Sequence, residues 1–100
     1  MLVCKQVFVS GRVQGVFFRD STRQVANELG LSGGVRNLYD GRVELQVCGD
    51  HDSLARLMKW LENGPKMAKV STIDSSDIDM SEADMMQSTR SAVFSVCPDA

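Results

Sequence analysis

The sequence predicts an α+β fold with elements in the order β-α-β-β-α-β and one trailing strand. Apolar residues alternate with period two in some segments, follow helical spacing in two others, and are separated by turn residues. The chain has 100 residues, which is long enough for one hydrophobic core in a two-layer architecture. We therefore expect a single domain over residues 1–100.

The first strand and helix follow from the N-terminal pattern. Residues 5–12 alternate, with Val7 and Val9 on one face and Phe8 on the other, as expected of a strand. A helix begins at Phe18, and its apolar face is formed by Phe18, Val25, Ala26 and Leu29. Gly30 is placed to close that helix in a left-handed conformation.

A hairpin is predicted next. Residues 33–38 form a short strand, and Tyr39-Asp40-Gly41 contains an Asp-Gly turn signal. The returning strand alternates apolar residues with others (Val43, Leu45 and Val47 against Glu44, Gln46 and Cys48). Residues 33–48 are therefore expected to form an antiparallel pair.

The second half repeats the helix-then-strand pattern. Asp50 and Asp52 offer a cap for a helix that ends at Gly64-Pro65 and has an apolar face of Leu54, Leu57, Met58 and Leu61. Residues 68–73 and 92–96 are the fourth and fifth strands. The whole order is the ferredoxin-like split βαβ pattern, an open antiparallel sheet with both helices on one face.

Residues 74–91 carry little periodic signal and many acids, so a solvated loop is expected there. Asp77-Ile78-Asp79 resembles part of a calcium loop, but Glu82 stands where such a loop needs glycine, and Ser88 stands at its last ligand position. The three methionines of this segment either cover the core edge or stay exposed (Met80, Met85 and Met86).

Composition narrows the possible partners. A formal net charge of −2 gives no broad basic surface, so nucleic acid is not expected as a partner. No apolar run reaches membrane-spanning length, and polar residues interrupt the N-terminal segment before a signal-peptide core forms (Lys5, Gln6 and Ser10). We expect no membrane association and a cytoplasmic location.

Cysteine and histidine usage points away from a metal centre. Cys4, Cys48 and Cys97 are an odd number in no recognised spacing, which favours free thiols over the alternative of an intermolecular disulfide. The single histidine, His51, is expected to be exposed near a helix start. No metal and no cofactor are therefore predicted.

The segment from Gly11 to Arg19 has the layout of an anion cradle. Gly11 and Gly15 permit backbone torsions that turn successive N–H groups toward one ligand, and the helix N-terminus adds a positive dipole end. Arg19 in the first helical turn opposes that dipole, so it needs an anionic partner. Asp20 is adjacent in sequence and does not share its helix face, which leaves a phosphate as the better partner. Arg23 either widens the positive field or is simply solvated.

This segment resembles the acylphosphatase family. It matches the family's first signature, Gly-x-Val-Gln-Gly-Val-x-Phe-Arg, at each fixed position. A second signature falls on Gly33, Gly34, Val35, Arg36, Asn37, Gly41, Val43 and Gly49. Two residues depart from the family pattern: Gly34 stands where an aromatic residue is usual, and Arg42 where a small hydroxyl residue is often found. The resemblance covers residues 5–75 well.

The resemblance implies hydrolysis of the carboxyl-phosphate bond of a small acyl phosphate by an in-line water, without a covalent intermediate. It places phosphate binding on residues 14–19 and catalysis on Arg19 and on Asn37, which orients the water; the phosphate-binding residues are Gln14, Gly15, Val16, Phe17, Phe18 and Arg19. Val16 and Phe18 are also expected to anchor the loop in the core. A monomer is expected.

Two other readings stay open at this point. A non-catalytic anion-binding module would keep the loop, and a regulatory or protein-interaction domain can use the same fold. No nucleophile motif such as Cys-x5-Arg or Gly-x-Ser-x-Gly is present.

Overall fold

The computed structural model describes residues 2–79 and 93–100 and contains the predicted order of elements. In chain order the elements are β1 (Leu2–Arg12), α1 (Phe18–Glu28), β2 (Ser32–Asn37), β3 (Val43–Asp50), α2 (His51–Leu61), β4 (Lys69–Ile78) and β5 (Phe94–Val96). No helix in the described part of the chain is long and apolar enough to cross a bilayer.

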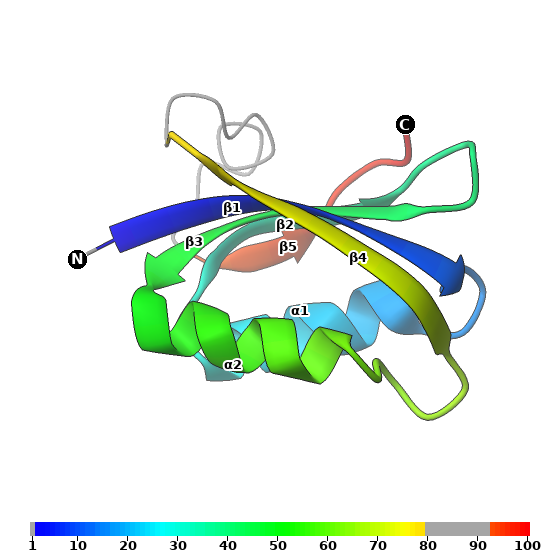
Figure 1. Cartoon of the computed structure of the whole chain (residues 1–100), viewed down its shortest axis with the longest axis horizontal. Coiled ribbons are helices and arrows are strands. Elements are labelled where there is room, and N and C mark those ends of the chain that lie inside the picture. Colours follow the sequence, from blue (N-terminus) through cyan, green and yellow to red (C-terminus); the bar gives the residue numbers. More distant parts are fainter. Residues whose placement is uncertain (1, 80–92) are drawn as a thin grey trace.

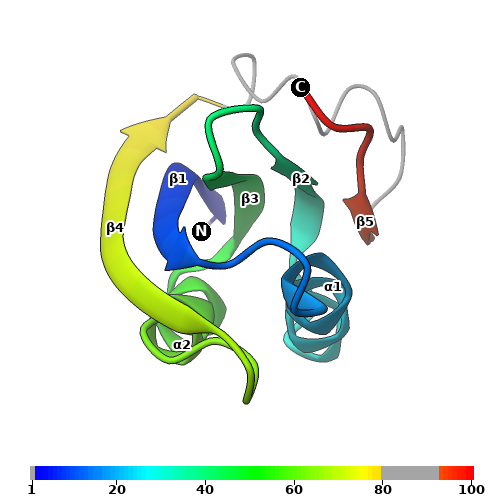
Figure 2. The same cartoon turned by 90° about the vertical axis from the view of Figure 1, so that its right-hand side faces the viewer.

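The strands form one sheet in the order β4-β1-β3-β2-β5. The pairs β4–β1, β1–β3 and β3–β2 are antiparallel as predicted, whereas β5 pairs parallel with β2, so the sheet is mixed at that edge. Both helices lie against the same face of the sheet (Figures 1 and 2). The predicted ferredoxin-like architecture is confirmed.

The core lies between this face and the helices. Buried side chains from the sheet (Val7, Val9, Val43, Leu45 and Val47) pack in one cluster with Phe18, Ala26, Leu54, Leu57 and Leu61 of the helices. The Phe18 ring also lies 6.1 Å from the Trp60 ring, centroid to centroid, and so links α1 to α2. The apolar faces predicted for both helices are therefore the faces that are buried.

The two helices differ at their N-termini. The Asp50 carboxylate caps α2 by accepting hydrogen bonds from the N–H groups of Asp52 at 3.1 Å and Ser53 at 3.4 Å. The first residue of α1, Phe18, follows a residue in the left-handed region that makes no side-chain cap. Gly30, with a φ of 73°, follows the C-terminal end of α1 as predicted.

The prediction of a loop from residue 74 is wrong for residues 74–78. They continue β4, paired antiparallel with β1, and Asp77 lies in this strand with its carboxylate 2.7 Å from Lys5 Nζ. Acidic residues on this exposed edge strand need no apolar periodicity, because main-chain pairing with β1 holds the segment. Residues 80–92, including Met80, Met85, Met86, Glu82, Ser88 and the expected start of the last strand at Ala92, lie outside the described residues.

The prediction of free thiols is wrong for two of the three cysteines. Cys4 of β1 and Cys48 of β3 face each other in register, with Cα atoms 4.1 Å apart, and form a disulfide. Cysteine spacing could not reveal this pair, because strand register sets it. Cys97 is free and buried, and burial raises the pKa of its thiol.

We predict that reduction of this disulfide lowers the free energy of unfolding. The bond closes a loop across a sequence separation of 44 residues, and a crosslink of this kind typically contributes about 2–4 kcal/mol. Urea titrations with and without reductant measure the difference. The double variant Cys4→Ser/Cys48→Ser is the control and should be insensitive to reductant; equal stability of oxidised and reduced wild type would contradict the prediction.

Candidate active site

The turn between β1 and α1 contains two residues in the left-handed backbone region. Gly15 has a φ of 73° and Phe17 a φ of 60°, and Phe17 is the non-glycine residue with positive φ in the described chain. Val16 and Phe18 are buried on either side of Phe17, at 7% and 1% exposure, and anchor the loop as predicted. The backbone thus reverses sharply and leads directly into the first turn of α1.

Gly11 has a different role from Gly15. It lies at an irregularity in the β1–β4 register with a φ of 122°, where an added Cβ would collide with the carbonyl oxygen of Lys69. No neighbouring atom lies near an added Cβ at Gly15, so there the requirement is the positive φ alone. Gly11 therefore serves strand pairing, and Gly15 serves the loop.

The N-terminus of α1 offers N–H groups and a positive dipole end to an outside ligand. It has no side-chain cap in the described structure, and uncapped first-turn N–H groups need some acceptor. The acid in this turn, Asp20, instead accepts from Arg23, whose Nη2 lies 2.9 Å from Asp20 Oδ1. Arg23 is therefore paired and does not widen the positive field.

Gln14 links the loop to the β2–β3 hairpin. Its Nε2 donates to the main-chain oxygens of Leu38, at 2.8 Å, and Arg42, at 3.0 Å. The neck of the hairpin is closed there by a main-chain bond from Leu38 N–H to the Arg42 oxygen. The Gln14 side chain, which the sequence analysis assigned to phosphate binding, thus binds the hairpin. Its bond to residue 42 uses the main-chain oxygen and does not depend on the arginine side chain there.

Arg19 and Asn37 meet at a residue that the sequence analysis did not select. Asp99 Oδ1 lies 3.0 Å from Arg19 Nη1 and accepts, at 3.3 Å, the main-chain N–H of Asn37. The chain after β5 is held beside the end of β2, where Ala100 N–H donates to the Asn37 oxygen. An acid near the C-terminus carries no local signal, so only this pairing identifies Asp99.

Asn37 ends β2, away from the turn centre, as predicted. Its Oδ1 is buried and has no hydrogen-bond partner among the described residues. A buried amide oxygen without a partner is uncommon in native proteins, and here it is a hydrogen-bond acceptor that the described fold leaves unused.

The neighbouring arginines are committed elsewhere. Arg36 Nε lies 2.7 Å from Glu44 Oε1, a carboxylate with only 6% of its side chain exposed. Arg42 pairs with Asp40 and lies over the Phe8 ring, 4.6 Å from its centroid. Both arginines are thus held in contacts within the described structure.

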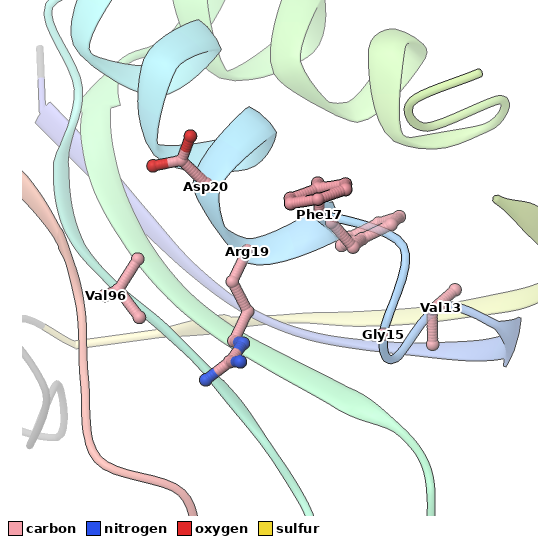
Figure 3. A pocket seen from close by; sticks show the side chains of 7 residues that line it. Val13, Gly15, Phe17, Arg19, Asp20 and Val96 are labelled. Carbon is pink, nitrogen blue, oxygen red and sulfur yellow. The ribbon is translucent and has the colours of Figure 1, made fainter. Parts of the chain in front are cut away.

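A cavity of about 440 Å³ opens beside the loop. Loop and helix residues line it together with Val96 of β5: Val13, Gly15, Phe17, Phe18, Arg19, Asp20 and Val96. Figure 3 shows Arg19 and Asp20 leaving the start of α1 in different directions. Across the described chain, no group of three or more His, Cys, Asp or Glu side chains is placed to hold a metal ion.

Comparison with known proteins places this arrangement in a family. A model of the acylphosphatase family matches residues 5–87. The acylphosphatase of Nitrosococcus oceani is 44% identical over 87 residues, which cover 87% of this chain and 98% of that protein.

Solved structures agree with the sequence comparison. The acylphosphatase from Coxiella burnetii superposes with a TM-score of 0.84 at 43% identity, covering 96% of this chain and 93% of that one. That from Bacillus subtilis gives 0.83 at 32% identity, covering 97% and 99%. The chain therefore belongs to the acylphosphatase family.

Proposed function

We propose that this protein hydrolyses acyl phosphates to a carboxylate and inorganic phosphate, by in-line attack of a water held at Asn37. The observation that carries the proposal is the shared contact at Asp99: one carboxylate oxygen accepts from both the Arg19 guanidinium and the Asn37 main chain. An oxygen of a phosphoryl group offers the same chemistry to the same donors.

In this proposal the loop and Arg19 bind the phosphoryl group. The main-chain N–H groups from Gly15 to Arg19 and the dipole of α1 face its oxygens, and the planar fork of Arg19 screens the charge. These donors act on a loose transition state whose charge is spread over the phosphoryl oxygens. Gln14 keeps the loop against the hairpin that carries Asn37.

Asn37 supplies the water. Its partnerless Oδ1 can accept a hydrogen bond from the water and so point the oxygen lone pair at phosphorus. The leaving carboxylate is a weak base, so it departs without protonation, and a phosphoryl oxygen takes the proton of the water. Among the described residues that line the cavity there is no hydroxyl or thiol side chain, and the one carboxylate, Asp20, is paired with Arg23, which supports attack without a covalent intermediate.

Asp99 must give way when substrate binds. Its carboxylate pairs with Arg19, the arginine of the cavity lining, and a second anion there meets charge repulsion. Both side chains are partly exposed, at 38% for Arg19 and 47% for Asp99, so solvent screens the pair and its opening costs little.

The proposal includes a monomer of one domain over residues 1–100 that acts on small acyl phosphates in the cytoplasm. The Cys4–Cys48 disulfide is an observation against the cytoplasmic part of the proposal, because cytoplasmic thiols are normally kept reduced. Labelling of free thiols in freshly lysed cells tests that part.

The roles of Arg19 and Asn37 separate by mutation. Asn37→Ala keeps the main-chain N–H and removes only the amide, so kcat should fall about 100-fold while the affinity for inorganic phosphate changes less than about twofold. Arg19→Ala should lower both kcat and the affinity for inorganic phosphate. The affinity should fall about 10- to 100-fold, because hydrogen bonds to a charged ligand are lost. Kinetics on benzoyl phosphate and phosphate titration measure the two effects.

Arg56→Ala, in α2, and Asn63→Ala, just after α2, change exposed residues and are the matched controls. Both should keep the wild-type kcat and phosphate affinity. Thermal melting of all four variants checks folding. A folded Asn37→Ala protein with normal kcat would show that the amide does not position the water.

Asp99→Asn should tighten the binding of inorganic phosphate. An exposed ion pair contributes about 0–1 kcal/mol, so the gain is at most about fivefold. Asp52→Asn removes an equal charge from the exposed first turn of α2 and should leave the affinity unchanged. Weaker phosphate binding in Asp99→Asn would mean that Asp99 holds Arg19 in place and does not compete with the substrate.

Turnover should not respond to chelators, since the proposed chemistry uses only N–H groups, one guanidinium and one amide. Benzoyl phosphate hydrolysis is measured before and after treatment with EDTA. A loss of activity that magnesium restores would contradict the mechanism.

A further inference from the structure

The cavity at the loop has two chemically different parts. Arg19, Asp20 and the main chain at Gly15 are the polar part, in which the Asp20 carboxylate is paired with Arg23. The apolar part of the lining consists of Val13, Phe17, Phe18 and Val96. Its volume of about 440 Å³ is in the range of small-molecule pockets. A ligand that fits both parts has an anionic head and an apolar body.

Phe17 is not explained by the packing of the protein. Its side chain belongs to a residue that is 82% exposed, so the ring contributes little to the core. Its φ of 60° lies in the left-handed region, which a bulky residue rarely occupies. Glycine or asparagine would satisfy this backbone more easily, so neither stability nor loop geometry accounts for an aromatic ring here.

A second exposed apolar residue borders the same cavity. Val96 is 41% exposed and comes from β5, whereas Phe17 comes from the loop before α1 (Figure 3). Tyr39 is also exposed, at 90%, but it does not line the cavity, so it is an exposed aromatic residue with which Phe17 can be compared. Exposed apolar side chains that converge on one hollow are typical of a binding site.

We propose that Phe17, with Val96, forms a subsite for the acyl group, so that the protein prefers acyl phosphates with an aromatic or extended apolar acyl chain. This inference rests on the proposed function, because it assumes that the phosphoryl group lies at Arg19. The acyl carbon chain then leaves the polar end of the cavity and lies against the Phe17 ring. Burial of both apolar surfaces favours such a substrate over one with a single methyl group.

The kinetic test compares benzoyl phosphate with acetyl phosphate. The ratio of their kcat/KM values is measured in wild type and in variants, because dividing the wild-type ratio by the variant ratio cancels the intrinsic reactivity of each substrate. Phe17→Asn tolerates the left-handed backbone and removes the apolar ring, and it should lower the ratio about three- to tenfold, mainly through KM for benzoyl phosphate. Phe17→Leu keeps an apolar side chain and should retain most of the preference.

Tyr39→Asn is the matched control, since it removes an exposed aromatic ring outside the cavity lining, and its ratio should equal that of wild type. An unchanged ratio in Phe17→Asn, or an equal fall in Tyr39→Asn, would overturn the inference.

A binding test separates this inference from the proposed function. Phenylphosphonate and methylphosphonate carry the same anionic head, and neither has a carboxyl-phosphate bond to hydrolyse. Wild type should bind phenylphosphonate about three- to tenfold more tightly, and Phe17→Asn should abolish most of that difference. Equal affinities in wild type overturn the acyl subsite and leave the proposed function standing, whereas absence of binding by both, together with absence of turnover, overturns both.

Discussion

The site depends on one side-chain amide that joins two separate turns. Gln14 Nε2 bonds to the main-chain oxygens of Leu38 and Arg42, so the loop that leaves β1 is held against the neck of the β2–β3 hairpin. Other contacts anchor each turn separately, such as the burial of Val16 and Phe18 in the loop and the contact of Arg42 with the Phe8 ring in the hairpin. Catalysis by positioning tolerates little error, so a fixed distance between loop and hairpin serves the proposed function directly.

Most arginines near the site are neutralised by nearby acids. Arg23, Arg36 and Arg42 each pair with such an acid, and Arg19 is the arginine that lines the cavity. Its own partner, Asp99, comes from the far end of the chain and is partly exposed. In the proposed function, an anion that binds here exchanges one weak ion pair for stronger contacts with a preorganised loop.

The N-termini of the two helices differ in a way that sets the loop before α1 apart. Helix α2 has its N-terminal N–H groups capped by Asp50, as in an ordinary structural helix, whereas α1 has no side-chain cap. The positive φ at Phe17 brings the chain into that uncapped turn. A strained backbone residue beside a helix N-terminus without a side-chain cap is the arrangement expected of a site that binds a ligand.

The sequence by itself determined the order of elements, the apolar faces of both helices and the place of the glycine-containing loop before α1, because each follows from local periodicity, turn residues or a short motif. It did not determine the extension of β4 through Asp77, the Cys4–Cys48 disulfide or the contact of Asp99 with Arg19. Each of these joins residues far apart in the chain. Strand register and the path of the C-terminal segment decide such contacts, and both arise only when the sheet has assembled.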